Sequence, residues 1–230
     1  MRTFLLLACA GLPLMAHDVI TTKVTWTREI SRIVYKRCAS CHHPGGSAFS
    51  LLSYEEARPW AVAIKEEVLA RRMPPWAAVK GFGDFRNDTG LTYEEIELVT
   101  DWVVGGAPNG DSNLAPPLPD FKSKAASAPR PGAILVVRDG AVLKRDLMVT
   151  AIRPEQLAEG SGLRVIAQRT DGQLDPLIWL YNYQARFAQT YYLRAPLRLP
   201  AGTRIRMDPE AAGAIALIAR PVTVAGRLAR

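Results

Sequence analysis

The sequence predicts a multidomain chain that is α then β: a small all-α domain followed by an antiparallel β-sandwich. Two observations predict this order. Apolar residues recur at helical spacing in the first half of the 230 residues, whereas short strand-like runs bounded by Gly, Pro and Asp fill the second half. A third observation separates the halves, because residues 111–132 are rich in Pro, Ala, Ser and Lys, a composition typical of a linker.

The N-terminus predicts export. Residues 1–16 contain an early positive charge at Arg2, an apolar run and a small residue, Ala16, at the expected cleavage position of a signal peptide. The run is too short to span a membrane, and no later run approaches that length. We therefore expect a periplasmic protein without a transmembrane segment, and Cys9 leaves a lipoprotein anchor as a minor alternative.

Charge differs between the halves. Residues 1–120 carry 12 Lys and Arg against 14 Asp and Glu, whereas residues 121–230 carry 17 against 8. The basic residues are spread along strand-like segments instead of clustering, so we expect no nucleic-acid partner. The basic half can bind an acidic redox protein or anionic lipid headgroups, so weak association with a membrane surface is one possibility. The simpler interpretation is that these charges only keep the surface solvated.

The first half predicts four helical segments. The first begins at Trp26 and ends near Cys38, and the others are expected at 53–58, at 59–72 and from Thr92 to about Val104. Two of them begin with a capping box, in which Ser or Thr is followed three residues later by Glu: Ser53 with Glu56, and Thr92 with Glu95.

The first of these helices leads into Cys38-Ala39-Ser40-Cys41-His42, which has the C-x-x-C-H spacing of covalent haem attachment. Two thiols at this spacing can form thioethers with one porphyrin edge, and the adjacent imidazole can bind the iron. We therefore expect one covalent haem c, held by Cys38 and Cys41, with His42 as an axial ligand. The alternatives are a redox dithiol and half of a zinc site. After cleavage at Ala16 no further cysteine remains for a second zinc pair.

Met73 is the expected sixth ligand of the iron. It precedes Pro74, Pro75 and Trp76, and it is the only methionine in residues 17–110. Prolines stiffen the loop that would hold the sulfur on the iron. The simpler interpretation is a methionine that fills the core. We also expect the free ring nitrogen of His42 to donate a hydrogen bond to the carbonyl of Pro44.

The order of haem helix, C-x-x-C-H, middle helices, methionine loop and terminal helix resembles the class I cytochrome c family. The strings 72–76, 92–102 and 106–108 resemble, more narrowly, cytochrome modules of large environmental bacterial proteins. This resemblance implies thioethers at Cys38 and Cys41 and axial bonds from His42 and Met73. It divides the chain into a signal peptide at 1–16, a cytochrome c haem domain at 17–110, a linker at 111–132 and a β-sandwich domain at 133–222.

The second half predicts short antiparallel strands. Strand-like runs lie at 133–137, 141–150, 163–169, 177–181, 190–194, 203–207 and 215–219, and Asp139-Gly140 predicts a hairpin between the first two.

The strings 170–172, 176–179 and 199–203 in these runs resemble the sandwich of copper-dependent, ascorbate-using monooxygenases. Copper there needs histidines, but none follows His43, and Met148 and Met207 alone cannot form the site. We therefore expect no copper chemistry.

These patterns together predict a monohaem c-type cytochrome that transfers electrons to and from redox partner proteins and is not itself an enzyme. A haem enzyme, a gas or peroxide sensor with an open sixth position, and a redox subunit of a copper monooxygenase system are the alternatives.

Overall fold

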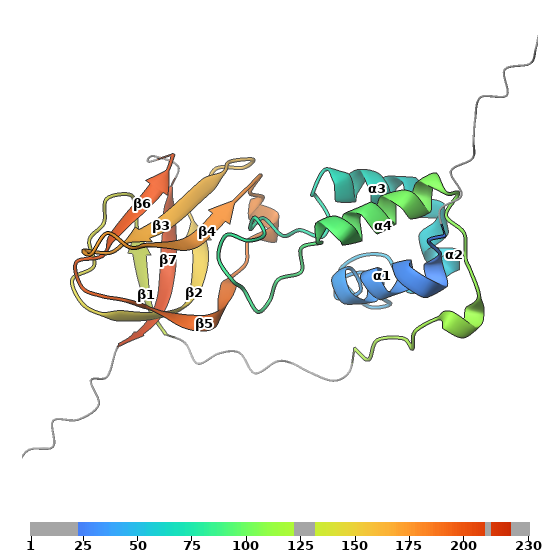
Figure 1. The fold of residues 1–230 in the computed structure, drawn as a ribbon, viewed down its shortest axis with the longest axis horizontal. Helices are drawn as coiled ribbons and strands as arrows, with labels where there is room; N and C mark the ends of the chain where they lie inside the picture. The colour runs from blue at the N-terminus through green and yellow to red at the C-terminus, as the bar shows by residue number, and fades with distance from the viewer. Residues whose placement is uncertain (1–22, 122–131, 210–212, 222–230) are drawn as a thin grey trace, which may run out of the picture.

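The computed structural model describes residues 23–121, 132–209 and 213–221. The predicted signal peptide and residues 122–131 of the predicted linker lie outside these residues. Figure 1 shows an elongated molecule with the helices at one end and the strands at the other. The segment between the third and fourth α-helices, residues 70–92, extends from the helical end to the strands and back, and we call it the inter-helix loop.

The helical end consists of short elements. In chain order they are the π-helix η1 (Trp26–Ile30), α1 (Ser31–Arg37), α2 (Tyr54–Ala57), the 3₁₀ turn η2 (Arg58–Trp60), α3 (Ala61–Leu69), α4 (Tyr93–Val104) and the 3₁₀ turn η3 (Ser112–Leu114). Both predicted capping boxes are confirmed. At the start of α2, the Glu56 amide donates to the Ser53 hydroxyl, and the Ser53 amide donates to the Glu56 carboxylate. Each box satisfies amide groups that would otherwise lack a partner at a helix start.

Two tryptophans connect the first helix to the last at the centre of the helical core. Trp26 of η1 and Trp102 of α4 are buried, and their ring centroids lie 6.0 Å apart. The indole nitrogen of Trp102 donates to the carbonyl of Pro108 (3.0 Å), so its polar atom is satisfied inside the core. Ile30, Ile33 and Val34 of the first helical segment are also buried and recur at helical spacing, so they form its apolar face.

The strands form two antiparallel sheets. The strands are β1 (Ala133–Val137), β2 (Leu147–Glu155), β3 (Leu163–Gln168), β4 (Leu174–Leu180), β5 (Tyr191–Leu199), β6 (Arg204–Asp208) and β7 (Ala214–Pro221), with η4 (Ala185–Phe187) between β4 and β5. One sheet has the order β1-β7-β2-β5 and the other the order β4-β3-β6. Along β3, buried and half-buried residues alternate, and the buried ones enter a core that both sheets share.

The predicted hairpin between 133–137 and 141–150 is wrong. β1 pairs with β7 instead, with Ala133 opposite Ala219. The expected turn does form at Asp139-Gly140, but the chain then crosses to the other sheet, where the Gly140 amide donates to the carbonyl of Ile205 (2.9 Å). A turn dipeptide fixes the local backbone, whereas the strand partner depends on which face must be buried.

The predicted fold class, a small all-α cytochrome domain followed by a sandwich, is also wrong. Among the described residues the strands contain more residues than the α-helices, which are only 4 to 12 residues long, so the structure is mainly β. The inter-helix loop, assigned from the sequence to the helical domain, contributes Trp76, Ala78 and Phe85 to the core of the sheets. Helical periodicity revealed the amphipathic faces but not the pairing of this loop with distant strands. The domain boundaries themselves stay a prediction.

Within the described residues, no helix has the length and apolarity needed to cross a membrane.

Candidate haem-attachment site

The end of α1 brings the three C-x-x-C-H side chains together on one turn. The Cys38 amide continues the helix by donating to the carbonyl of Val34 (2.8 Å). The carbonyl of Cys38 then accepts from the amides of Cys41 (3.1 Å) and His42 (3.0 Å). The chain therefore stays coiled through His42, and both cysteines and the imidazole arise from one compact turn.

The two cysteines are half-buried free thiols. Burial, with a further contribution from the Glu95 carboxylate, raises the pKa of the Cys38 thiol to about 12. A redox dithiol requires the opposite shift, which comes from a helix N-terminus or a neighbouring cation. Cys38 instead lies at the C-terminus of α1, where the helix dipole disfavours a thiolate. The redox-dithiol alternative is therefore a poor match to this turn.

The imidazole of His42 is oriented by a backbone carbonyl. Its Nδ1 lies 2.8 Å from the carbonyl oxygen of Phe49. Because a carbonyl can only accept, Nδ1 carries a proton, and this contact selects the tautomer whose lone pair is on Nε2. A metal-binding histidine is typically fixed in this way, with one ring nitrogen donating to a carbonyl and the other free to ligate.

The predicted acceptor for His42, the carbonyl of Pro44, was wrong. Gly45 has a φ of +81°, which lets the chain reverse directly after Pro44. The returning segment pairs with the attachment turn through a β-bridge between His42 and Ala48, and this places the carbonyl of Phe49 at the ring.

His43 has a different environment from its neighbour. Its Nδ1 lies 2.8 Å from the carbonyl oxygen of Ala39, and its ring stacks on Phe121 with centroids 4.2 Å apart and an interplanar angle of 5°. The imidazole of His43 is thus held by contacts within the turn and with Phe121, which lies in the predicted linker.

Aromatic side chains beside His42 are exposed. Phe49 packs edge-on against the imidazole (5.0 Å) and against Trp60 (4.8 Å), yet 52% of Phe49 and 49% of Trp60 are exposed. These two adjacent rings give the surface beside His42 an apolar character. Two free thiols, an imidazole with an available Nε2 and this apolar surface fit a covalently attached haem.

Met73 lies elsewhere. It is half-buried on the inter-helix loop and lines a cavity of about 440 Å³ together with Val68, Trp76, Leu91 and Ile96. None of the C-x-x-C-H side chains lines this cavity. The structure therefore assembles Cys38, Cys41 and His42 but does not bring Met73 into a shared cavity with them.

Sequence reasoning missed the ion pair beside the attachment turn. Arg37 is only 8% exposed, and its Nε lies 2.9 Å from a carboxylate oxygen of Glu95 at the start of α4. Its Nη1 donates to the carbonyl of Asp88 on the inter-helix loop (3.2 Å). The residue before Cys38 thus joins α1, α4 and the loop. The capping box placed Glu95 at a helix start, but no sequence signal connected it to Arg37.

The two methionines of the strands do not converge. Met207 on β6 is buried in the shared core, whereas Met148 lies between core-facing residues of β2, on the opposite face of its sheet. Among the described residues, no group of three or more His, Cys, Asp or Glu side chains is placed to hold a metal ion.

No family model, no curated protein and no solved structure matches this chain. Its function is therefore inferred from its own residues.

Proposed function

We propose that this protein is an exported, periplasmic monohaem c-type cytochrome that transfers electrons to and from redox partner proteins. The observation that carries the proposal is the attachment turn. Cys38 and Cys41 lie on one turn with His42, whose Nδ1 is occupied by the carbonyl of Phe49 and whose Nε2 is available to a metal. Cys38, Cys41, His42 and Met73 would hold a haem, which when bound would supply one-electron redox chemistry.

The residues of the chain have separate tasks in this proposal. Cys38 and Cys41 hold the macrocycle, and the proton on Nδ1 keeps His42 in one tautomer and one orientation. Phe49 and Trp60 provide apolar contact and exclude water on the side of His42. Met73 would supply the sixth ligand from the inter-helix loop, where Pro74 and Pro75 restrict the backbone, although Met73 and the attachment turn line no common cavity among the described residues.

Covalent attachment can be tested with protein purified from the periplasm. Acid–acetone extraction should leave the colour on the polypeptide. Cys38→Ala and Cys41→Ala should each weaken attachment, because each removes one thioether. If the colour of the correctly matured parent moves into the solvent, the proposal fails.

His42 and His43 form a matched pair for the axial ligand. His42→Ala should change the visible spectrum of both oxidation states, because it removes a ligand of the iron. His43→Ala should leave the spectrum unchanged, because the ring of His43 donates to the carbonyl of Ala39 and stacks on Phe121. Equal spectral changes in the two variants would contradict the assigned role of His42.

A second candidate is a haem protein with an open sixth position, which binds a gas or peroxide. The position of Met73 favours it, because Met73 lines a cavity that none of the C-x-x-C-H side chains lines, and without this sulfur the sixth position would be open. Carbon monoxide distinguishes the candidates. An electron carrier ligated by Met73 should bind it poorly in the ferrous state, and Met73→Ala should bind it readily. Ready binding by the parent would favour the sensor or enzyme.

A further inference from the structure

The inter-helix loop is hydrogen-bonded to the outer strand of the three-stranded sheet. The Val79 amide donates to the carbonyl of Trp179 (2.8 Å), and the Tyr181 amide, directly after β4, donates to the carbonyl of Ala77 (2.9 Å). β4 is at the edge of its sheet, so these bonds pair an edge that would otherwise be open.

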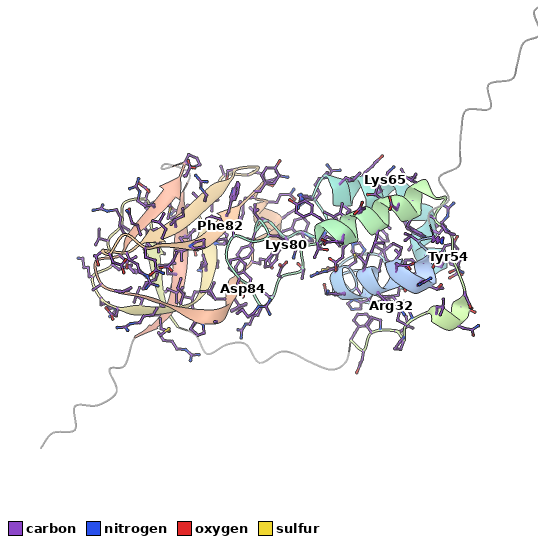
Figure 2. All side chains as sticks on the ribbon, in the orientation of Figure 1. Arg32, Tyr54, Lys65, Lys80, Phe82 and Asp84 are labelled. Atoms are coloured by element: carbon purple, nitrogen blue, oxygen red, sulfur yellow. The ribbon has the colours of Figure 1, made fainter. Side chains whose placement is uncertain are left out.

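The same loop is also bonded to the outer strand of the four-stranded sheet. The Arg86 amide donates to the carbonyl of Tyr192 (2.9 Å), and the Arg194 amide donates to the carbonyl of Asp84 (2.9 Å). Figure 2 shows Lys80, Phe82 and Asp84 on this part of the loop, where it lies against the strands. One loop therefore bonds to an edge strand of each sheet, β4 and β5.

Asn87 adds side-chain bonds to this contact. Its Nδ2 donates to the carbonyl of Thr190 (2.8 Å), and its Oδ1 accepts from the amide of Tyr192 (3.0 Å). The carboxamide thus offers one donor and one acceptor to β5, as a paired strand residue would. By contrast, the side-chain ion pair between Asp84 and Arg194 is exposed on both partners and contributes little.

Gln189 bonds to the loop close to Met73. Its Nε2 donates to the carbonyl of Pro75 (3.1 Å), which lies two residues after Met73. Pro74 and Pro75 each have a fixed φ, so few backbone torsions separate Met73 from this bond. The ring of Trp76 packs on Tyr191 of β5 with centroids 4.8 Å apart. The position of Met73 therefore depends on residues more than 100 positions later in the chain.

We propose that the β strands position Met73 for the haem iron, and that Gln189 and Asn87 are the positioning residues. This inference rests on the proposed function, in which the thioether of Met73 is the sixth ligand. The sheets would then contribute to the same site by restricting the inter-helix loop. Less conformational entropy of the loop would be lost when the sulfur of Met73 binds the iron. Neither residue touches the cofactor in this proposal, and both act through the loop.

The test uses the full-length holoprotein with Gln189→Ala, Asn87→Ala and, as a matched control, Gln184→Ala. Gln184 also lies between β4 and β5, but within the described part of the chain its side-chain oxygen accepts only from the neighbouring Arg186. The readouts are the weak far-red sulfur-to-iron absorption band of the ferric protein and the affinity of the ferrous protein for carbon monoxide. Far-UV circular dichroism at the same temperature verifies that each variant is folded.

Loss of one hydrogen bond should raise the carbon monoxide affinity of Gln189→Ala about fivefold, and loss of two should raise that of Asn87→Ala about twenty-fivefold, with a weaker far-red band in both. Gln184→Ala should match the parent. If Asn87→Ala does not fold, Asn87→Asp keeps the acceptor for Tyr192, loses the donor to Thr190 and should give the smaller effect. A parent without the band overturns the role of Met73 in the proposed function. A parent with the band and variants that match it overturn the positioning role alone.

Discussion

Replacement of Trp76 by alanine tests whether the inter-helix loop belongs to the core of the sheets. Trp76 is 8% exposed, and its ring contacts Tyr191 at 4.8 Å and Phe85 at 6.0 Å between centroids. A buried tryptophan replaced by alanine typically costs about 3–5 kcal/mol of unfolding free energy, from the lost burial and the cavity that remains. Each aromatic pair accounts for about 0.5–1.5 kcal/mol beyond its buried area. We therefore expect a loss near the upper end of this range.

The assay is urea unfolding followed by far-UV circular dichroism, which does not depend on the fluorescence of the deleted ring. Trp179→Ala is the matched control, because Trp179 on β4 is 39% exposed and has an edge contact with Phe82 and a cation–π contact with Arg164. It should cost about 1–2 kcal/mol. Globular proteins typically have an unfolding free energy of about 5–15 kcal/mol, so the difference between the losses in Trp76→Ala and Trp179→Ala should be easy to measure. Equal losses in the two variants would refute the placement of Trp76 in the core.

Three further predictions follow from other contacts. A single protease cut introduced within 122–131 should leave the two fragments associated, because the inter-helix loop is hydrogen-bonded to the strands. Size-exclusion chromatography checks this, and elution of a separate haem fragment would contradict it. The hydroxyl of Ser50 and backbone amides hold the pKa of Glu56 below its usual range, so the stability it provides is present at neutral pH and is lost as the pH falls through the lowered pKa. Glu56→Gln should therefore flatten the fall of the urea midpoint below about pH 4.3, and an unchanged slope would count against it. Arg37→Met should cost about 3 kcal/mol in urea unfolding, because it removes the buried partner of Glu95 and the donor to the carbonyl of Asp88. The carboxylate then keeps the exposed Lys36 and the Thr92 amide, so Lys36→Met should cost less than about 1 kcal/mol. Similar losses in the two variants would disprove the importance of the buried pair.

Local patterns predicted the local structure well. The capping boxes at Ser53 and Thr92 mark the starts of α2 and α4, and the run at 163–169 became β3 (Leu163–Gln168). These signals depend on neighbours in the chain, such as a hydroxyl that accepts from an amide three residues later. The C-x-x-C-H turn is local for the same reason, so its three side chains were expected to be close and are close.

Contacts between distant segments were not predictable in this way. Asp139-Gly140 gave a correct turn but a wrong partner for β1, because the partner is decided by the packing of the whole sheet. The fold class failed at the inter-helix loop. One signal was available there. The 19 residues between the helices expected at 59–72 and from Thr92 contain Trp76, Phe82 and Phe85, and this segment is too long and too aromatic for an ordinary connection between two helices. That signal indicates a segment packed against something else, but it does not identify β4 and β5.

The same distinction applies to the two expected iron ligands. The surroundings of His42 are set by nearby residues in the chain, whereas those of Met73 are set by distant ones. His42 is oriented by Phe49, seven residues away, and a reversal at Gly45 that needs a positive φ is enough to bring them together. Met73 is held through Pro75 by Gln189, which lies 114 positions further along the chain than Pro75. Ligation by histidine should therefore survive changes in the strands, whereas ligation by methionine should respond to them. A chain truncated after residue 121 tests this difference. If that fragment folds, it should retain covalent haem at the attachment turn, and its ferrous form should bind carbon monoxide more tightly than that of the full chain. A folded fragment with the far-red band and carbon monoxide affinity of the full-length protein would show that the strands do not control Met73.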